Sequence, residues 1–154
     1  MGVGPSMKET TLHHFRDPLI EITRQDESID LVGVAIIGSP QDNSQKFYGA
    51  ERLGVLADAL DVDGILIYAE GYGNQHIDFA AHMEELGKQN IPVVGLTFSA
   101  DGFVVENEYM VNIIDLDKSG EAKETEIVGE NTVSAVDTVR ALRLLKKCLE
   151  AQFK

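Results

Sequence analysis

The chain is poor in cysteine, and this scarcity limits how it can be stabilised and where it can work. Cys148 is the single cysteine among 154 residues, so no internal disulfide can form. The first thirty residues contain no apolar run as long as a signal peptide or a membrane span requires. We therefore expect a protein of the cytoplasm that has no membrane segment.

Basic side chains and aromatic side chains are also scarce. The 13 Lys and Arg residues are outnumbered by 26 Asp and Glu residues, which gives a formal net charge of -13. Such a surface repels phosphate backbones, so we expect no nucleic-acid partner. No tryptophan is present, which argues against a large surface for stacking sugars or bases. The length is that of a single domain, here residues 1–154, with residues 1–12 as an irregular amino-terminal arm.

The sequence offers no recognisable metal site or catalytic triad. His13 and His14 are adjacent, whereas His76 and His82 are six residues apart; only Asp78 and His82 have the i, i+4 spacing of a metal-binding pair. No third ligand lies nearby, so we predict no metal and assign the histidines surface or capping roles. Cys148 has no neighbouring base or second thiol, and we predict no catalytic residue.

The centre of the chain, residues 63–99, predicts a complete strand, helix and strand. Residues 64–69 and 91–96 are apolar at both odd and even positions, as strands covered on both faces are. A crossover helix between them requires parallel pairing, so both strands end at the same edge of the sheet. We expect the loops at residues 70–74 and 97–102 to share a crevice at that edge.

Alternating strands and helices continue along the chain and predict an α/β fold. We expect a three-layer sandwich with a mostly parallel sheet of four to five strands, flavodoxin-like or Rossmann-like. The further predicted elements are a helix from Asp17-Pro18, a strand at 31–37, a helix at 49–60, a short helix at 106–110, a strand at 111–116, an edge strand at 126–128 and a helix that a Ser134/Asp137 capping box begins. The residues expected on the buried faces of two helices are Leu53, Leu56, Ala57 and Leu60, then Val136, Val139, Leu142, Leu145 and Leu149.

Several residues at the predicted crevice have the chemistry of a ligand site. Glu70 could receive an ammonium group, or it could be a solvated or helix-capping carboxylate. Glycines at 71 and 73 allow close backbone approach to a ligand, although a sharp turn into a helix needs the same residues and the third glycine of a dinucleotide fingerprint is missing. The candidate ligand-binding residues are Glu70, Gly71, Gly73, Asn74, Thr97 and Ser99.

The residue order in five segments resembles a known protein family. Residues 13–18 read HHFRDP, residues 60–64 read LDVDG, residues 70–74 read EGYGN, residues 85–92 read ELGKQNIP and residues 128–133 read VGENTV. Together they are similar to the carboxy-terminal, pyruvoyl-chain region of the proproteins of D-proline reductase and of component B of glycine, sarcosine and betaine reductases. The resemblance covers nearly the whole chain, and the proline reductase branch looks closer.

The resemblance implies a protein that takes part in reductive amino-acid fermentation. In the family, cleavage before a cysteine leaves a pyruvoyl group that binds the substrate amine, and a selenocysteine of another subunit attacks the activated carbon. This sequence has no cysteine before Cys148 and no selenocysteine. The resemblance therefore implies an accessory or structural subunit without the pyruvoyl cofactor, which associates with catalytic reductase subunits or forms a homo-oligomer.

Two alternatives remain open at this point. The chain could be an independent domain that binds a small molecule such as an amino acid at the crevice. It could instead make a pyruvoyl group from serine, for which Ser6 is the candidate; the Gly4-Pro5-Ser6 setting supplies no general base and is typical of a loop.

Overall fold

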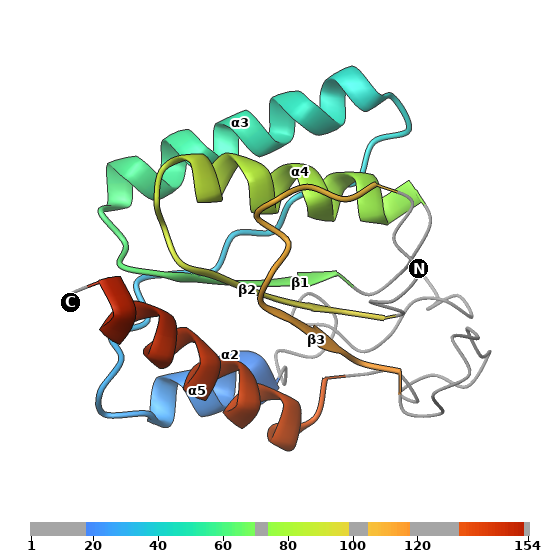
Figure 1. Ribbon diagram of the computed structural model, residues 1–154. Helices are drawn as coiled ribbons and strands as arrows, with labels where there is room; N and C mark the ends of the chain where they lie inside the picture. The colour runs from blue at the N-terminus through green and yellow to red at the C-terminus, as the bar shows by residue number, and fades with distance from the viewer. Residues whose placement is uncertain (1–17, 70–73, 99–104, 118–132, 153–154) are drawn as a thin grey trace.

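The computed structural model describes residues 18–69, 74–98, 105–117 and 133–152, and it has an α/β fold (Figure 1). Three parallel strands, β1 (Ile65–Ala69), β2 (Val93–Thr97) and β3 (Ile113–Asp115), form a sheet in the order β1-β2-β3. The register places Ile65 opposite Val93 and Ala69 opposite Thr97. The predicted parallel pairing across residues 63–99 is confirmed.

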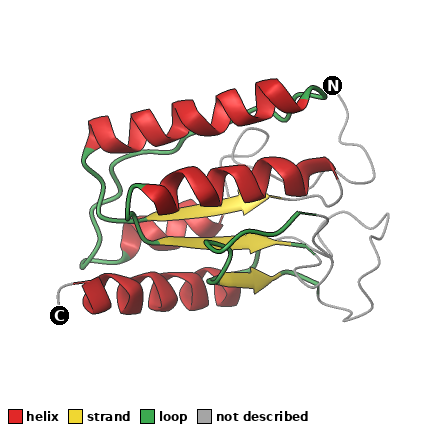
Figure 2. Ribbon diagram, turned by 45° about the horizontal axis from the view of Figure 1, so that its top comes forward, coloured by secondary structure: helices red, strands yellow, loops and turns green. Residues whose placement is uncertain are grey.

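Helices cover both faces of this sheet, as the sequence predicted. Helix α4 (Asn74–Lys88) connects β1 to β2 and packs on one face, and α3 (Asn43–Leu60) lies on the outer side of α4 (Figures 1 and 2). Helix α5 (Ala135–Gln152) covers the opposite face, with α2 (Pro18–Gln25) packed beside it. Within the described ranges, no helix combines the length and apolar character needed to cross a bilayer.

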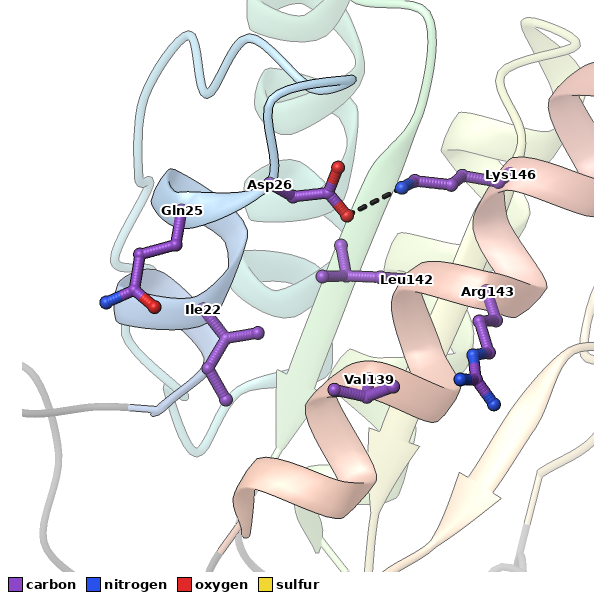
Figure 3. A pocket seen from close by; sticks show the side chains of 7 residues that line it. All are labelled: Ile22, Gln25, Asp26, Val139, Leu142, Arg143 and Lys146. Atoms are coloured by element: carbon purple, nitrogen blue, oxygen red, sulfur yellow. Dashed lines mark hydrogen bonds and ion pairs between the residues drawn. The ribbon is translucent and has the colours of Figure 1, made fainter.

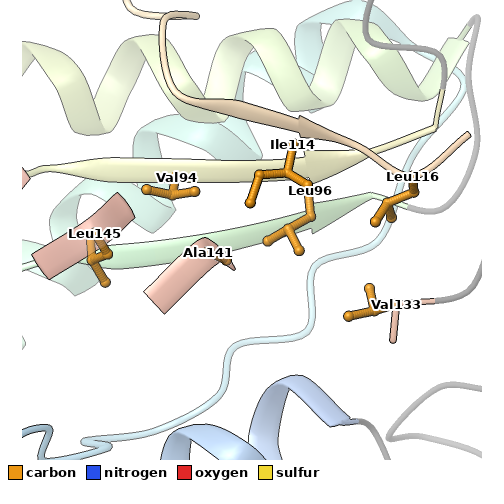
Figure 4. Close-up of a cluster of buried hydrophobic side chains, with 7 residues drawn as sticks. All are labelled: Val94, Leu96, Ile114, Leu116, Val133, Ala141 and Leu145. Atoms are coloured by element: carbon orange, nitrogen blue, oxygen red, sulfur yellow. The ribbon is translucent and has the colours of Figure 1, made fainter. Parts of the chain in front are cut away.

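The core has two parts because successive side chains of β2 point to opposite faces of the sheet. Val94 and Leu96 face α5 (Figure 4), and the buried side chains on that face are Val94, Leu96, Ile114, Leu116, Val133, Ala141 and Leu145. On the other face Phe79 of α4 lies over Gly95, where an added Cβ would come within 2.3 Å of the Phe79 ring. Gly95 therefore provides the space that lets α4 pack closely on the sheet.

The predicted strand at residues 31–37 is wrong, and the reason is a lack of cover. The segment is extended but makes no hydrogen bond with any described residue, and the exposed fraction of its Ile36 side chain is 66%. A parallel strand needs helices over both of its faces. Here α3 packs mainly on α4, and the segment stays open to solvent. The described sheet consequently has three strands and not the predicted four to five.

Helix α3 begins earlier than predicted and buries a different face. It starts at Asn43 because the Asp42 carboxylate accepts a hydrogen bond from the Ser44 amide, an N-cap that the 49–60 prediction missed. The buried side chains are Lys46, Ala50, Gly54 and Ala57, which are mostly small, as close packing against another helix requires. Leu56 and Leu60 of the predicted buried face are exposed.

Two further predicted elements differ from those in the structure. The predicted helix at 106–110 is a turn, in which the Asn107 side chain binds the Tyr109 amide and the Ala80 carbonyl. The strand predicted at 111–116 is limited to the three residues of β3. The 126–128 strand and the arm at 1–12 lie outside the described residues.

The last helix begins as predicted. The Ser134 hydroxyl and amide both donate to the Asp137 carboxylate, and the Asp137 amide donates to the Ser134 hydroxyl oxygen, which completes the capping box. Leu142 and Leu145 are buried as expected. Val136 and Val139 of the predicted buried face are exposed.

Candidate functional site

The predicted crevice falls only partly within the described structure. Asn74 is the first residue of α4 and is exposed, whereas Thr97 ends β2 and is fully buried. Since Ala69 and Thr97 are opposite each other in the register, the two strands do end at one edge, as predicted. The candidates Glu70, Gly71, Gly73 and Ser99 lie outside the described residues.

Two histidines at this end of the fold are buried, so the predicted surface role is wrong for both. His76 is fully buried, and its Nε2 lies 3.3 Å from the Phe98 carbonyl oxygen. Burial lowers the pKa of His76, and the Phe98 hydrogen bond opposes that shift only in part. His82 is 8% exposed. The sequence could not show that these histidines are buried. The apolar positions of α4 predict only the helix face that packs on the sheet, whereas α3 covers a second face of the same helix.

A buried ion pair joins three separate parts of the chain. Lys46 of α3 is 1% exposed, and its Nζ lies 2.5 Å from Asp78 Oδ2 of α4. The Ser39 hydroxyl, which follows the extended segment, donates to the same carboxylate oxygen at 2.5 Å and accepts from Lys46 at 3.1 Å. A buried ammonium is tolerated only with such partners. This cluster therefore holds the end of the segment, α3 and α4 together.

His82 lies one helical turn after Asp78 and completes the polar group. Burial is the main cause that lowers the pKa of His82; the Asp78 carboxylate raises it and the Lys46 ammonium lowers it further. The imidazole is consequently neutral at pH 7. Its Nε2 has no hydrogen-bond partner among the residues that the structure describes.

A cavity of about 820 Å³ adjoins this cluster. Ser39, Asp78 and His82 line one end of it, and most of the remaining wall is apolar, including Leu53 and Ile67. Such a mixture of apolar walls and a few polar groups is typical of small-molecule sites. It can orient a ligand by hydrogen bonding.

The same residues do not form a catalytic triad. In a triad the serine hydroxyl donates to a histidine, which a carboxylate orients from its other side. Here the Ser39 hydroxyl donates to Asp78, and no described hydrogen bond joins Ser39 to His82. Among the described residues no group of three metal-ligating side chains is placed to hold an ion. The Ser39 hydroxyl is therefore not positioned for activation by His82.

A second, smaller hollow of about 290 Å³ lies between α2 and α5 (Figure 3). Lys146 Nζ and Asp26 Oδ2 are 2.6 Å apart across it, and this hydrogen bond is the main cause that lowers the pKa of Asp26 to about 2. The pair is partly exposed to water. We interpret it as a clamp between two helices; Gln25 and Arg143 also line the hollow.

We predict that Lys46→Met destabilises the protein by about 3–5 kcal/mol, because it leaves the Asp78 carboxylate buried without its counter-charge. Urea unfolding followed by circular dichroism measures the change. The matched control is Lys88→Met, whose ammonium pairs with Glu84 and Glu85 on the surface, and which should cost at most about 1 kcal/mol. Equal stability of the two variants would contradict the structural role of the cluster.

We also predict that stability falls as the pH drops below about 6.5, the usual pKa of an unfolded histidine. The pKa values of His76 and His82 are lowered in the folded state, so the unfolded chain binds more protons over that range and is favoured there. His82→Gln should reduce the slope of unfolding free energy against pH between about 7.5 and 5.5. A slope that stays unchanged in this variant would rule out a buried neutral His82.

Comparison with known proteins assigns the chain to a family. The family model described as glycine/sarcosine/betaine reductase component B subunits matches residues 2–133. The chain is 46% identical over 149 residues to the D-proline reductase proprotein of Acetoanaerobium sticklandii, and 32% identical over 97 residues to the sarcosine reductase complex component B subunit alpha of Peptoclostridium acidaminophilum. These matches cover 96% and 62% of this chain but 24% and 23% of the relatives, so the chain spans about a quarter of the length of either relative. No solved structure matches it. The chain belongs to the family of glycine/sarcosine/betaine reductase component B subunits, as the sequence motifs indicated.

Proposed function

We propose that the chain is an accessory or structural subunit of a D-proline reductase-like complex in reductive amino-acid fermentation. The observation that carries this proposal is a match over 96% of the chain to a D-proline reductase proprotein, in a sequence whose only cysteine is Cys148. The family chemistry needs a cysteine-derived pyruvoyl group near the HHFRDP segment. Without that cysteine, the chain contributes structure and contacts to the complex and not the reactive carbonyl.

The proposal includes several finer points. The chain takes a place like that of the pyruvoyl chain, carries no cofactor, works in the cytoplasm and contacts the catalytic subunits or other copies of itself. Its sheet in the assembled state has four to five strands in a flavodoxin-like or Rossmann-like arrangement. The succession of parallel strands and covering helices in the described part supports that architecture.

We predict that an affinity-tagged chain expressed in a proline-fermenting bacterium co-purifies with the reductase subunits. The intact mass of the recovered chain should equal that of the full-length sequence, and a hydrazine probe for carbonyl groups should not label it. Recovery of the chain alone, while active reductase assembles without it, would refute the subunit role. A shortened mass with hydrazine labelling would support a pyruvoyl group made from Ser6 instead.

A second candidate function is the binding of a small amine or amino acid. The cavity beside Asp78 and His82 favours it, because a neutral imidazole and a carboxylate can both accept hydrogen bonds from an amine. The crevice candidates Glu70, Gly71, Gly73, Asn74, Thr97 and Ser99 belong to the same proposal. Thr97 does not line that cavity, but its hydroxyl is buried and has no hydrogen-bond partner among the described residues, which makes it a candidate on the crevice side.

We predict that proline or a related cyclic amine binds with a dissociation constant below about 1 mM, which corresponds to about 4 kcal/mol of binding free energy. Isothermal titration calorimetry with proline, glycine and sarcosine measures it. His82→Gln should weaken binding of the amine about tenfold. A ligand that lacks the amine should bind the wild-type chain and His82→Gln with equal affinity. Absence of heat with every amine at millimolar concentration would refute this candidate.

A further inference from the structure

The charged residues that line the cavity of about 820 Å³ are all acidic. They are Asp30, Asp61, Asp63 and Asp78, and the described lining contains no lysine and no arginine. The Lys46 ammonium pairs with Asp78, but Lys46 is not itself a lining residue. A carboxylate that enters this cavity therefore meets like charge and finds no cation in the described wall to neutralise it.

The polar end of the cavity offers hydrogen-bond acceptors. The Ser39 hydroxyl and the Lys46 ammonium both donate to Oδ2 of Asp78, and Oδ1 makes no hydrogen bond with the described residues. His82 is 8% exposed, and its Nε2 is likewise without a partner among them. A buried polar atom without a partner is unfavourable, and a ligand that donates a hydrogen bond to it removes that cost. An amine has the donors that this end of the cavity lacks.

Aliphatic side chains form most of the remaining wall. Ile65 and Ile67 come from β1, Leu53 from α3, and Leu142 and Leu145 from α5. The volume lies within the range of small-molecule sites and exceeds what a single polar group fills. The wall is therefore suited to the hydrocarbon part of a ligand.

We propose that the cavity binds amines that carry no carboxylate, with the nitrogen at Asp78 and His82 and the hydrocarbon part against the aliphatic wall. This inference rests on the second candidate function, the binding of an amine at this cavity, and narrows it. Amino acids are then poor ligands, because their carboxylate enters an acidic cavity together with the amine.

A matched pair of ligands tests the exclusion of carboxylates. Prolinamide and proline share the ring and the amine, and differ in a neutral amide against a carboxylate. Isothermal titration calorimetry at 0.15 M salt, where the Debye length is about 8 Å, measures both affinities. We expect prolinamide to bind the full chain at least tenfold more tightly than proline.

An alkyl series tests the contact with the aliphatic wall. Burial of each CH₂ group strengthens binding by about fourfold, so pentylamine should bind at least tenfold more tightly than propylamine. Pentanoate has a chain of the same length with a carboxylate in place of the amine, and should bind at least tenfold more weakly than pentylamine. Equal affinity of the two amines, or tighter binding of pentanoate, would overturn the proposal.

Two glutamine variants locate the ligand. Gln75 lines the cavity and lies one helical turn before Asp78, whereas Gln89 follows the end of α4 and is not a lining residue. Both are exposed, so neither change alters the core. Gln75→Lys supplies a cation to the wall and should reduce the preference for prolinamide over proline to less than threefold. Gln89→Lys adds the same charge elsewhere and should leave the preference unchanged. Equal preferences in the two variants would overturn the proposed location.

The outcomes separate this inference from the function on which it rests. Proline that binds as tightly as prolinamide, or more tightly, overturns the exclusion of carboxylates and leaves the binding of amino acids standing. Absence of heat with all the amines, proline included, refutes both the inference and the second candidate function. Neither result bears on the proposed subunit role, which co-purification tests.

Discussion

The parallel pairing of β1 with β2 is the constraint on which the described structure depends. Parallel neighbours cannot be joined by a tight turn, so the chain must cross the sheet through α4 before it returns. The crossover places α4 on one face, and β2 becomes a fully buried strand with α5 on the other. It also fixes the ends of both strands at one edge, where Thr97 and the beginning of α4 lie. Packing, burial and the location of polar residues follow from this arrangement.

The buried cluster of Lys46, Asp78 and Ser39 carries a desolvation cost. Its desolvation is offset by short charge-assisted hydrogen bonds, and its geometry depends on α3 packing against α4. The same packing explains the exposed segment at 31–37. Because α3 packs mainly on α4, the polar anchor at Ser39 is fixed while the apolar residues before it are left exposed.

Family membership and geometry bear on function at different levels. The match over residues 2–133 assigns the chain to the component B family, whose named members are reductase proteins several times its length. The described geometry adds a cavity with mostly apolar walls and, at that cavity, the buried side chains of Asp78 and His82.

The sequence by itself determined the parallel β1–α4–β2 unit, the helices on both faces, the Ser134/Asp137 cap and the family. Each of these depends on local chemistry: apolar runs with the strand or helix period, a hydroxyl and a carboxylate three residues apart, and contiguous motifs. Only the tertiary structure decided that Lys46, His76 and His82 are buried and that residues 31–37 are not. Burial depends on which helix covers which surface, and α3 can place its small residues on a sheet or on another helix with the same sequence pattern. That choice is made by packing between distant segments, which no local pattern encodes.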